Sequence, residues 1–150
     1  MSLIQLQQTS YGRAGGALTG SWPEAHAMDG EGLDAFLDER RYCVLATALQ
    51  DGRPQARPVA FTVLGDEIWF ATVAGGRLRN LRRAQWVSVV VTQGDGDEHR
   101  AVAADGPVEL CEPPEELLQR WEERFGSRAE WAVAWFLLRP ERLFSYDARR

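Results

Sequence analysis

The 150-residue sequence contains few cysteines and histidines and no long apolar run. Cys43 and Cys111 are the only cysteines, too few for a disulfide framework or a thiolate metal site. His26 and His99 are the only histidines, and neither belongs to a cluster with metal-ligand spacing, so we expect both at the surface. No apolar run approaches the roughly 20 residues that a membrane-spanning helix needs. The sequence therefore predicts no metal site and no membrane partner.

The sequence also has no net positive charge. The formal net charge is -5, and a phosphate backbone rewards proteins of the opposite sign, so we expect no nucleic-acid partner. The first ten residues, MSLIQLQQTS, lack the basic region and apolar core that are typical of a signal peptide. Together with the low cysteine content, this favours a cytoplasmic protein.

Length and composition fit one domain with a single core. The sequence is 45% hydrophobic and 26% charged, which is ordinary for a globular protein. Residues 1–30 carry glycine, serine and alanine without steady periodicity, and we expect them to form a poorly ordered arm. Five apolar residues of this arm could pack on a neighbouring surface: Leu3, Ile4, Leu6, Tyr11 and Trp22. The folded domain is then residues 31–150.

Alternating and β-branched runs predict consecutive antiparallel strands. The expected strands cover residues 42–49, 54–64, 68–73, 86–93 and 99–110, with strand-like segments on both sides of Pro140. Asp51-Gly52 marks a tight hairpin, and we expect a bend near Gly106 and Pro107. In the second strand, five side chains share one face: Gln55, Arg57, Val59, Phe61 and Val63. The pattern indicates a mainly β (α+β) fold, an antiparallel barrel with appended helices.

Helix signals separate some of these strands. Helices are expected over residues 31–40, over the arginine-rich stretch after Gly76, over residues 113–126, and as a short piece near 128–132. Asp29 can cap the first helix, and Leu78 and Leu81 can turn the arginine-rich helix toward the core. Trp121, Trp131 and Trp135 are expected in the core or at a dimer interface.

A concentrated positive corner follows the strand that ends in Thr72. Gly75-Gly76 leads into a helix start with four arginines: Arg77, Arg79, Arg82 and Arg83. N–H groups at a helix N-terminus carry partial positive charge, and glycines let a ligand approach the backbone closely. With the Thr72 hydroxyl and the forked Arg77 cation, the corner predicts a site for a small anion such as phosphate. A solvated helical face is the alternative, and Arg83 is expected largely in water.

Five short motifs follow one another along the chain: Asp51-Gly52-Arg53-Pro54, Pro58-Val59-Ala60-Phe61, Phe70-Ala71-Thr72, Asn80-Leu81 and Pro140-Glu141-Arg142. In this order and spacing they resemble the FMN-binding split-barrel family, the pyridoxamine 5′-phosphate oxidase-like superfamily. The resemblance covers roughly residues 33–147.

This resemblance implies a six-stranded antiparallel split β-barrel that forms a homodimer, with FMN in two equivalent grooves between the subunits. It implies that the strand from Arg57 to Phe61 lies along the isoalloxazine ring, and that Arg79 lies beside the phosphate. The implied cofactor-binding residues are Arg57, Pro58, Val59, Ala60, Phe61, Ala71, Thr72, Gly76, Arg77 and Asn80. Many family members have lysine where Arg77 stands, and arginine keeps the charge and can bind phosphate bidentately.

No acid, base or nucleophile motif is visible, and Cys43 is more typical of a core residue, so no catalytic side chain is assigned. Flavin chemistry is compatible with this, because the cofactor carries the hydride or electrons. The resemblance therefore implies an FMN-binding oxidoreductase that acts on an unknown small molecule. A deazaflavin-dependent reductase and a non-catalytic flavin- or haem-binding protein remain alternatives. The ending FSYDARR differs from that of true pyridoxamine-phosphate oxidases, so vitamin B6 oxidation is not expected.

Overall fold

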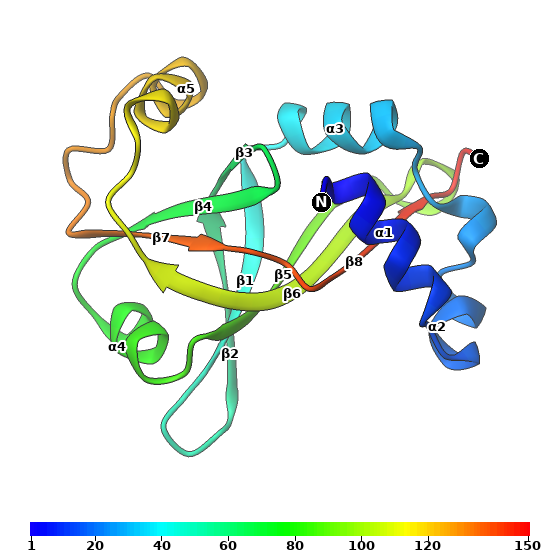
Figure 1. The fold of residues 1–150 in the computed structure, drawn as a ribbon, viewed down its shortest axis with the longest axis horizontal. Coiled ribbons are helices and arrows are strands. Elements are labelled where there is room, and N and C mark those ends of the chain that lie inside the picture. The colour runs from blue at the N-terminus through cyan, green and yellow to red at the C-terminus, as the bar shows by residue number, and fades with distance from the viewer.

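The computed structural model describes all 150 residues. The strands form a curved antiparallel sheet that is flanked by helices (Figure 1). The elements in chain order are α1 (Leu3–Gly12), α2 (Gly16–Ser21), η1 (Glu24–His26), α3 (Gly30–Glu39), β1 (Tyr42–Ala48), β2 (Pro54–Ala60), β3 (Thr62–Leu64), β4 (Glu67–Thr72), α4 (Gly76–Arg83), β5 (Trp86–Gln93), η2 (Gly96–Glu98), β6 (Arg100–Leu110), α5 (Glu115–Phe125), β7 (Ala134–Leu138) and β8 (Arg142–Asp147). None of the helices combines the length and the hydropathy that a membrane-spanning helix requires.

The strands form one sheet in the order β2-β1-β5-β6-β7-β4-β3, and β8 also pairs with β6. Every pair is antiparallel, which confirms the predicted fold class. The sheet has eight strands rather than six, because two lengths of chain are each divided in two. Phe61 separates β2 from β3, and the segment around Pro140 separates β7 from β8. A proline has no N–H to give to a ladder, so pairing stops there.

Strand β6 joins the two parts of the sheet. Residues 100–107 pair with β5 and residues 100–105 with β8, whereas residues 108–110 pair with β7. At the change of partner, a Cβ on Gly106 would lie 2.5 Å from the carbonyl oxygen of Arg139, closer than any side chain allows. The bend predicted near Gly106 and Pro107 coincides with this point, where only glycine lets the two backbones approach.

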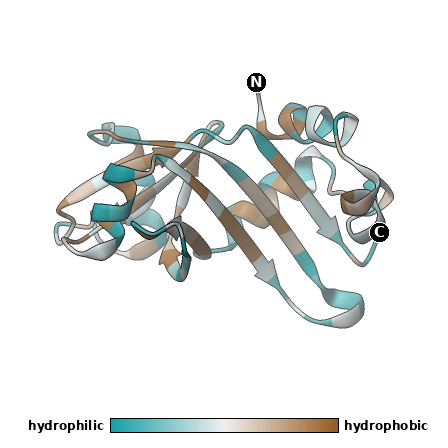
Figure 2. Cartoon of the chain, turned by 90° about the horizontal axis from the view of Figure 1, so that it is seen from below, coloured by the Kyte–Doolittle hydropathy of each residue, from teal (hydrophilic) through white to brown (hydrophobic).

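The strands bury one face in a core of 22 residues. Along β1, Cys43, Leu45 and Thr47 point inward and are buried, whereas Tyr42 and Val44 point outward and are exposed. Figure 2 shows that apolar residues concentrate on the strands and that the connecting turns are mostly hydrophilic. The predicted core position of Cys43 is confirmed. The exposed apolar residues Tyr42 and Val44 leave the outer face of β1 without a covering layer.

Most of the expected helices are present. α3 begins at its predicted cap, where the Asp29 carboxylate accepts a hydrogen bond from the N–H of Gly32 at 2.8 Å. α5 ends at Gly126, whose φ of 78° closes the helix in the left-handed region. The short helix predicted near residues 128–132 is wrong. Ala129 has a φ of 56°, which a right-handed helix cannot include, and the segment is a single turn closed by the N–H of Ala132.

The first 30 residues do not form the poorly ordered arm that the sequence predicted. Helix α1 lies along the edge of β8 that no strand pairs with (Figure 1). Ser10 Oγ accepts the N–H of Leu143 at 3.0 Å, and the Tyr11 hydroxyl donates to the Ser145 carbonyl at 3.0 Å. The N–H of Met28 donates to Ser145 Oγ at 2.8 Å. The contacts of Ser10 and Tyr11 satisfy backbone groups that an edge strand would otherwise expose.

Apolar packing accompanies this polar network. Leu3, Leu6 and Tyr11 are buried, so these members of the predicted packing set do contact a neighbouring surface. The Tyr11 ring packs edge-on against Phe144, with 5.1 Å between centroids. The segment lacks strong periodicity because its partners are polar groups far away in the sequence.

Candidate functional site

A cavity of about 230 Å³ lies between β1, β2 and the start of α4. Its lining residues are Leu45, Thr47, Gln55, Arg57, Gly76 and Arg77. In the β1–β2 hairpin, Leu45 pairs with Arg57 and Thr47 pairs with Gln55, so these four side chains point to the same side of the sheet. We call this cavity the arginine pocket.

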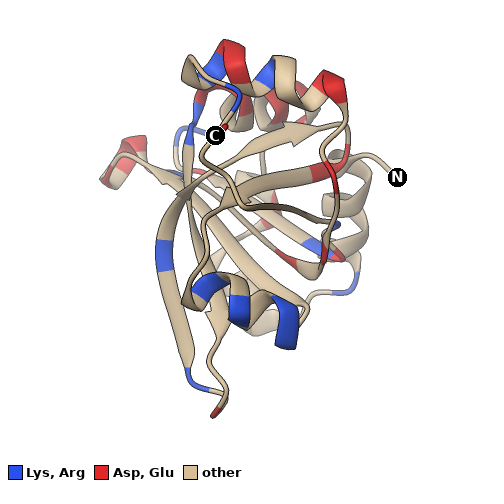
Figure 3. Ribbon diagram, turned by 90° about the vertical axis from the view of Figure 1, so that its left-hand side faces the viewer, with Lys and Arg blue, Asp and Glu red and all other residues tan.

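Helix α4 carries the positive charge over this part of the sheet. Gly75 precedes it with a φ of 150°, a conformation that side-chain-bearing residues rarely adopt. Leu78 and Leu81 are buried beneath the helix, as predicted, which turns Arg77 toward the pocket. The arginines of α4 form a blue group in Figure 3, and the helix contains no acidic residue. The first N–H groups of a helix have no intrahelical acceptor, so they are free for an anion.

The charge of the arginine pocket is not balanced from within the chain. Burial lowers the pKa of Arg77, an effect that the nearby Cys43 sulfur opposes and the Arg57 cation reinforces. Burial also raises the pKa of the Cys43 thiol to about 12, although Arg77 lowers it in part. Cys43 is therefore a neutral thiol at physiological pH and supplies no counter-charge. Because no carboxylate lines the pocket, a bound anion would compensate the two arginines.

A buried amide lies directly beside the pocket. Asn80 is 4% exposed, and its Nδ2 donates to Thr47 Oγ1 at 3.3 Å and to Gln55 Oε1 at 3.5 Å. Arg83 Nη2 donates to Asn80 Oδ1 at 3.0 Å and to the Ala48 carbonyl at 2.7 Å. Arg83 is exposed, as expected, but it is not a free cation: it connects the last turn of α4 to Asn80 and to the end of β1.

The structure brings together four of the ten residues that the resemblance implied. Arg57, Gly76 and Arg77 line the pocket, and Asn80 contacts two further lining residues. The other six lie elsewhere: Val59 and Phe61 in the core, Pro58 exposed on β2, Ala60 and Ala71 packed near Trp121, and Thr72 buried at the end of β4. Their roles toward a cofactor stay predictions.

Thr47 and Gln55 escaped the sequence analysis as site residues. Neither belongs to a charged or glycine-rich motif, and Gln55 was placed only on the face of its strand that carries Arg57. The Asp51-Gly52 hairpin sets the register that pairs Thr47 with Gln55. The position of this turn was therefore the one sequence signal that could have indicated both residues.

An exposed apolar group lies next to the end of β4. Val73, Trp131 and Val133 are 52%, 53% and 62% exposed, and the N–H of Val133 donates to the Thr72 carbonyl at 2.9 Å. Of the tryptophans expected in the core or at a dimer interface, Trp121 is 1% exposed and lies in the core, whereas Trp131 is at the surface, where an interface position stays a prediction. The turn at Ala129 holds Trp131 there.

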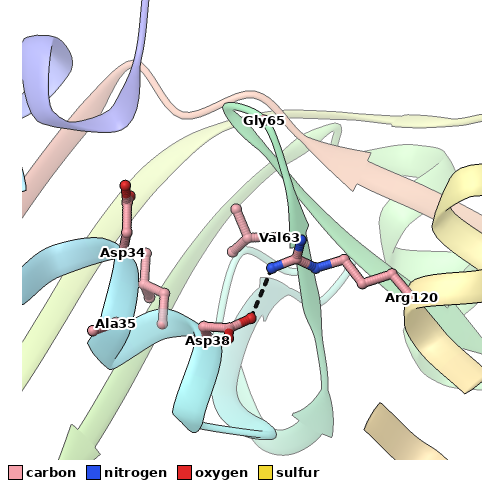
Figure 4. A pocket seen from close by; sticks show the side chains of 7 residues that line it. Asp34, Ala35, Asp38, Val63, Gly65 and Arg120 are labelled. Atoms are coloured by element: carbon pink, nitrogen blue, oxygen red, sulfur yellow. Dashed lines mark hydrogen bonds and ion pairs between the residues drawn. The ribbon is translucent and has the colours of Figure 1, made fainter. Parts of the chain in front are cut away.

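A second cavity, of about 370 Å³, lies between α3, α5 and the turn after β3 (Figure 4). Arg120 extends from α5 toward Asp38 on α3, and the two side chains pair at 2.7 Å. Arg124 of α5 donates to the Asp38 and Arg40 carbonyls as well. Asp38 of α3 pairs with both arginines of α5, so we assign these residues a structural role in holding α5 against α3.

Comparison with known families tests the resemblance. Residues 30–148 match the family model for pyridoxamine 5′-phosphate oxidase. The chain belongs to this family. The match begins at the start of α3 and leaves out α1 and α2. No curated protein sequence gave a significant match.

Solved structures share the fold. A conserved hypothetical protein from Mycobacterium tuberculosis is 28% identical, covers 84% of this chain and 89% of its own, and superposes with a TM-score of 0.73. A FAD-binding protein from Mesorhizobium loti is 21% identical over 79% of this chain and 93% of its own, with a TM-score of 0.64. HutZ, the haem storage protein of Vibrio cholerae, is 21% identical over 81% of this chain and 98% of its own, with a TM-score of 0.63. The pyridoxamine 5′-phosphate oxidase-like fold therefore occurs in proteins with different ligands.

Proposed function

We propose that the protein is an FMN-dependent oxidoreductase whose arginine pocket holds the flavin phosphate. One observation carries the proposal: Arg57, Arg77 and the N-terminus of α4 converge on a cavity that no carboxylate lines. Phosphate oxygens are strong acceptors, and guanidinium and helix N-terminal N–H groups are the donors that suit them. The flavin-binding relative from Mesorhizobium loti agrees with a flavin as ligand on this fold.

The size of the pocket suits the phosphate tail and not the whole cofactor. Its volume of about 230 Å³ is below the roughly 300–1,000 Å³ of sites that enclose a drug-sized ligand. Strand β2 ends the sheet, so its second edge has no strand partner. A ligand anchored at Arg57 can pass over this edge, where unpaired backbone groups are available to the isoalloxazine ring.

We also propose that a second copy of the chain covers the ring as part of a homodimer. Val44 and Val90 are paired across β1 and β5 and are each 39% exposed. Tyr42 and Trp86, on the same two strands, are 63% and 48% exposed. Apolar residues that adjoin one another on an open sheet face are typical of a protein interface.

In this proposal, bound FMN supplies the redox chemistry, and the chain supplies orientation and electrostatics. Arg57 and Arg77 hold the phosphate, and the edge of β2 orients the ring system. Cys43 takes no part as a nucleophile, because its thiol is buried and its pKa is raised by that burial to about 12. The substrate is a small molecule that reaches the flavin from the open side.

The histidines favour a flavin over haem as the ligand of this pocket. His26 and His99 both lie against the ring of Tyr146 on β8, at 5.2 and 5.9 Å between ring centroids. Both are half-buried there and not at the free surface, where the sequence predicted them. Neither lines the arginine pocket, so that pocket offers no imidazole to a haem iron.

Titration of the purified protein with FMN, FAD, a deazaflavin coenzyme and haemin tests the function. We expect FMN to bind at micromolar concentration or below, more tightly than riboflavin, and bound FMN to be reduced by a nicotinamide or chemical donor and reoxidised by an acceptor. Binding of the deazaflavin coenzyme in preference to FMN would change the cofactor assignment. Binding of haemin alone would overturn the proposal.

A further inference from the structure

The arginine pocket has a polar support that lies outside it. Arg83 does not line the cavity, but it donates one hydrogen bond to Asn80 Oδ1 at 3.0 Å and another to the Ala48 carbonyl at 2.7 Å. The Asn80 side chain in turn contacts Thr47 and Gln55, which do line the cavity. A substitution of Arg83 can therefore alter the ligand affinity of the pocket through Asn80.

The chemistry of arginine determines which way the Asn80 amide faces. A guanidinium has only donors, so it can pair with the amide oxygen and not with the amide nitrogen. With Oδ1 facing Arg83, the NH₂ group must face Thr47 and Gln55, in agreement with the 3.3 and 3.5 Å contacts. The second Arg83 contact, to Ala48, holds the guanidinium where it can do this.

This orientation decides which hydrogen-bonding groups the pocket presents. Asn80 occupies the acceptor oxygens of Thr47 and Gln55, so the Thr47 O–H and the Gln55 NH₂ are left to point at a ligand. Neither group donates to any other atom of the chain. The other polar groups at the pocket, the Arg57 and Arg77 guanidinium groups and the N–H groups that begin α4, are donors as well.

We infer that Arg83 is a positioning residue that makes the arginine pocket a donor-only site, selective for fully ionised oxyanions such as the dianion of a phosphate monoester. An anion whose oxygens only accept can use every group in such a site. A hydroxyl or a protonated phosphate would place a hydrogen against a donor and lose a contact. The inference deepens the proposed function, because it rests on the phosphate as the group that the pocket receives.

The first test compares Arg83→Met with Arg82→Met. Both changes remove one charge from the last turn of α4, but Arg82 is exposed and its side chain forms no hydrogen bond or ion pair. We expect Arg83→Met to weaken FMN about 5- to 10-fold and riboflavin less than twofold, whereas Arg82→Met weakens both less than twofold at 0.15 M salt. Equal losses in the two variants would show a diffuse charge effect and overturn the inference.

The second test replaces the donor group of Asn80 with an acceptor in a side chain of the same shape. In Asn80→Asp, the pair with Arg83 is kept, but both oxygens of the new side chain accept, so Thr47 and Gln55 turn their hydrogens toward it. The new carboxylate also adds a negative charge that repels the phosphate. We expect FMN affinity to fall about 100-fold and riboflavin affinity to change little. Thr47→Val, which removes one donor, should cost about 2- to 10-fold for FMN alone. If Asn80→Asp bound FMN as tightly as the natural chain, the inference would be wrong.

A pH series and inorganic phosphate complete the design. FMN affinity of the natural chain should rise several-fold between pH 5 and pH 7.5, because the monoester loses its second proton near pH 6. The charged groups facing the ligand are Arg57 from β2 and Arg77 from α4, and Cys43 of β1 stays neutral, so the ligand is the group that titrates. No rise would overturn the preference for the dianion.

The two proposals can fail separately. If inorganic phosphate binds the natural chain and Arg83→Met weakens it while no flavin binds, the flavin function is wrong and the donor-only site stands. If FMN binds and none of the variants affects it, the flavin function stands and the donor-only site is wrong. Thermal unfolding and riboflavin binding of each variant show that a loss of FMN affinity does not come from a misfolded chain.

Discussion

At the scale of single residues, Arg77 determines how the pocket holds an anion. It is half-buried beside Arg57, its pKa is lowered by burial, and it forms no ion pair within the chain. We expect Arg77→Ala to remove a charge-assisted contact of about 1.5–3 kcal/mol, which is a loss of roughly 10- to 150-fold in FMN affinity. Arg77→Lys should lose less, because it keeps the charge and gives up only the forked geometry.

Flavin titrations of these variants, with Arg82→Ala as the control, measure the effect. Arg83, which the sequence alone predicted to lie largely in water, is unsuitable as a control because it donates a hydrogen bond to Asn80. Riboflavin and FMN should bind the Arg77→Ala protein with more similar affinities than they bind the natural one. Equal losses from Arg77→Ala and Arg82→Ala would point to a diffuse positive face.

Asp147 gives a second residue-scale prediction, concerning acid stability. Hydrogen bonds from Arg149 lower the pKa of this carboxyl from 3.8 to about 2, against the opposing effect of burial. A carboxyl whose pKa is lower in the folded state stabilises the fold above its unfolded pKa and loses that contribution as pH falls. We expect the free energy of unfolding to decline between about pH 4 and pH 2 through this group.

Urea unfolding at several pH values checks this expectation, with Asp147→Asn as the comparison. The variant should be less stable than the natural chain at pH 7 and should approach it in stability near pH 2. Parallel curves for the two proteins across this range would show that the Arg149 contact contributes no stability.

At the scale of secondary-structure elements, the contact between α1 and β8 depends on single hydroxyl groups. Ser10→Ala leaves the buried N–H of Leu143 without its acceptor, which should cost about 1–3 kcal/mol and lower the melting temperature by about 2–4 °C for each kcal/mol. Thr9→Ala is the matched control, because the Thr9 hydroxyl donates only to Gln5 within its own helix. Similar melting temperatures for the two variants would contradict the assigned contact.

The elements that the sequence predicted well are those whose signals are local. Asp29 marks the start of α3, Gly126 marks the end of α5, and the Asp51-Gly52 turn lies between β1 and β2. Leu78 and Leu81 also indicated the side of α4 that faces the core. Caps, tight turns and periodicity each depend on a few neighbouring residues, so a single sequence contains them.

Elements decided by distant contacts were missed. Nothing near Phe61 in the sequence shows that β2 stops pairing there, since the break depends on which strands lie beside it. The same holds for α1, whose polar partners lie on β8, and for Thr47 and Gln55, which become site residues only through the register of the sheet. Arg57, Gly76 and Arg77 of the arginine pocket could be predicted from the sequence, whereas Thr47 and Gln55 could not.

At the scale of the whole molecule, the exposed face of β1 and β5 predicts the state of association. We expect light scattering at micromolar concentration to give about twice the chain mass of 16.8 kDa. Val90→Glu places a charge opposite Val44 in the centre of this face and should shift the protein toward monomer. FMN affinity should fall with it, because the ring loses the cover of the second copy.

Leu110→Glu is the control for this change, since Leu110 is similarly exposed, at 37%, but lies on the part of β6 that pairs with β7. It should leave the mass unchanged. A natural chain that is monomeric and still binds FMN tightly would contradict the shared groove.

The position of α1 also has a consequence for the order in which the chain folds. The residues that hold this helix, Leu143 and Ser145, lie 133 and 134 positions after their partners Ser10 and Tyr11. During synthesis α1 leaves the ribosome long before β8, the strand that it covers. Contacts of such large sequence separation form late, so the apolar residues of α1 stay uncovered until β8 has been made. The position of α1 is therefore fixed only after β8 has been made.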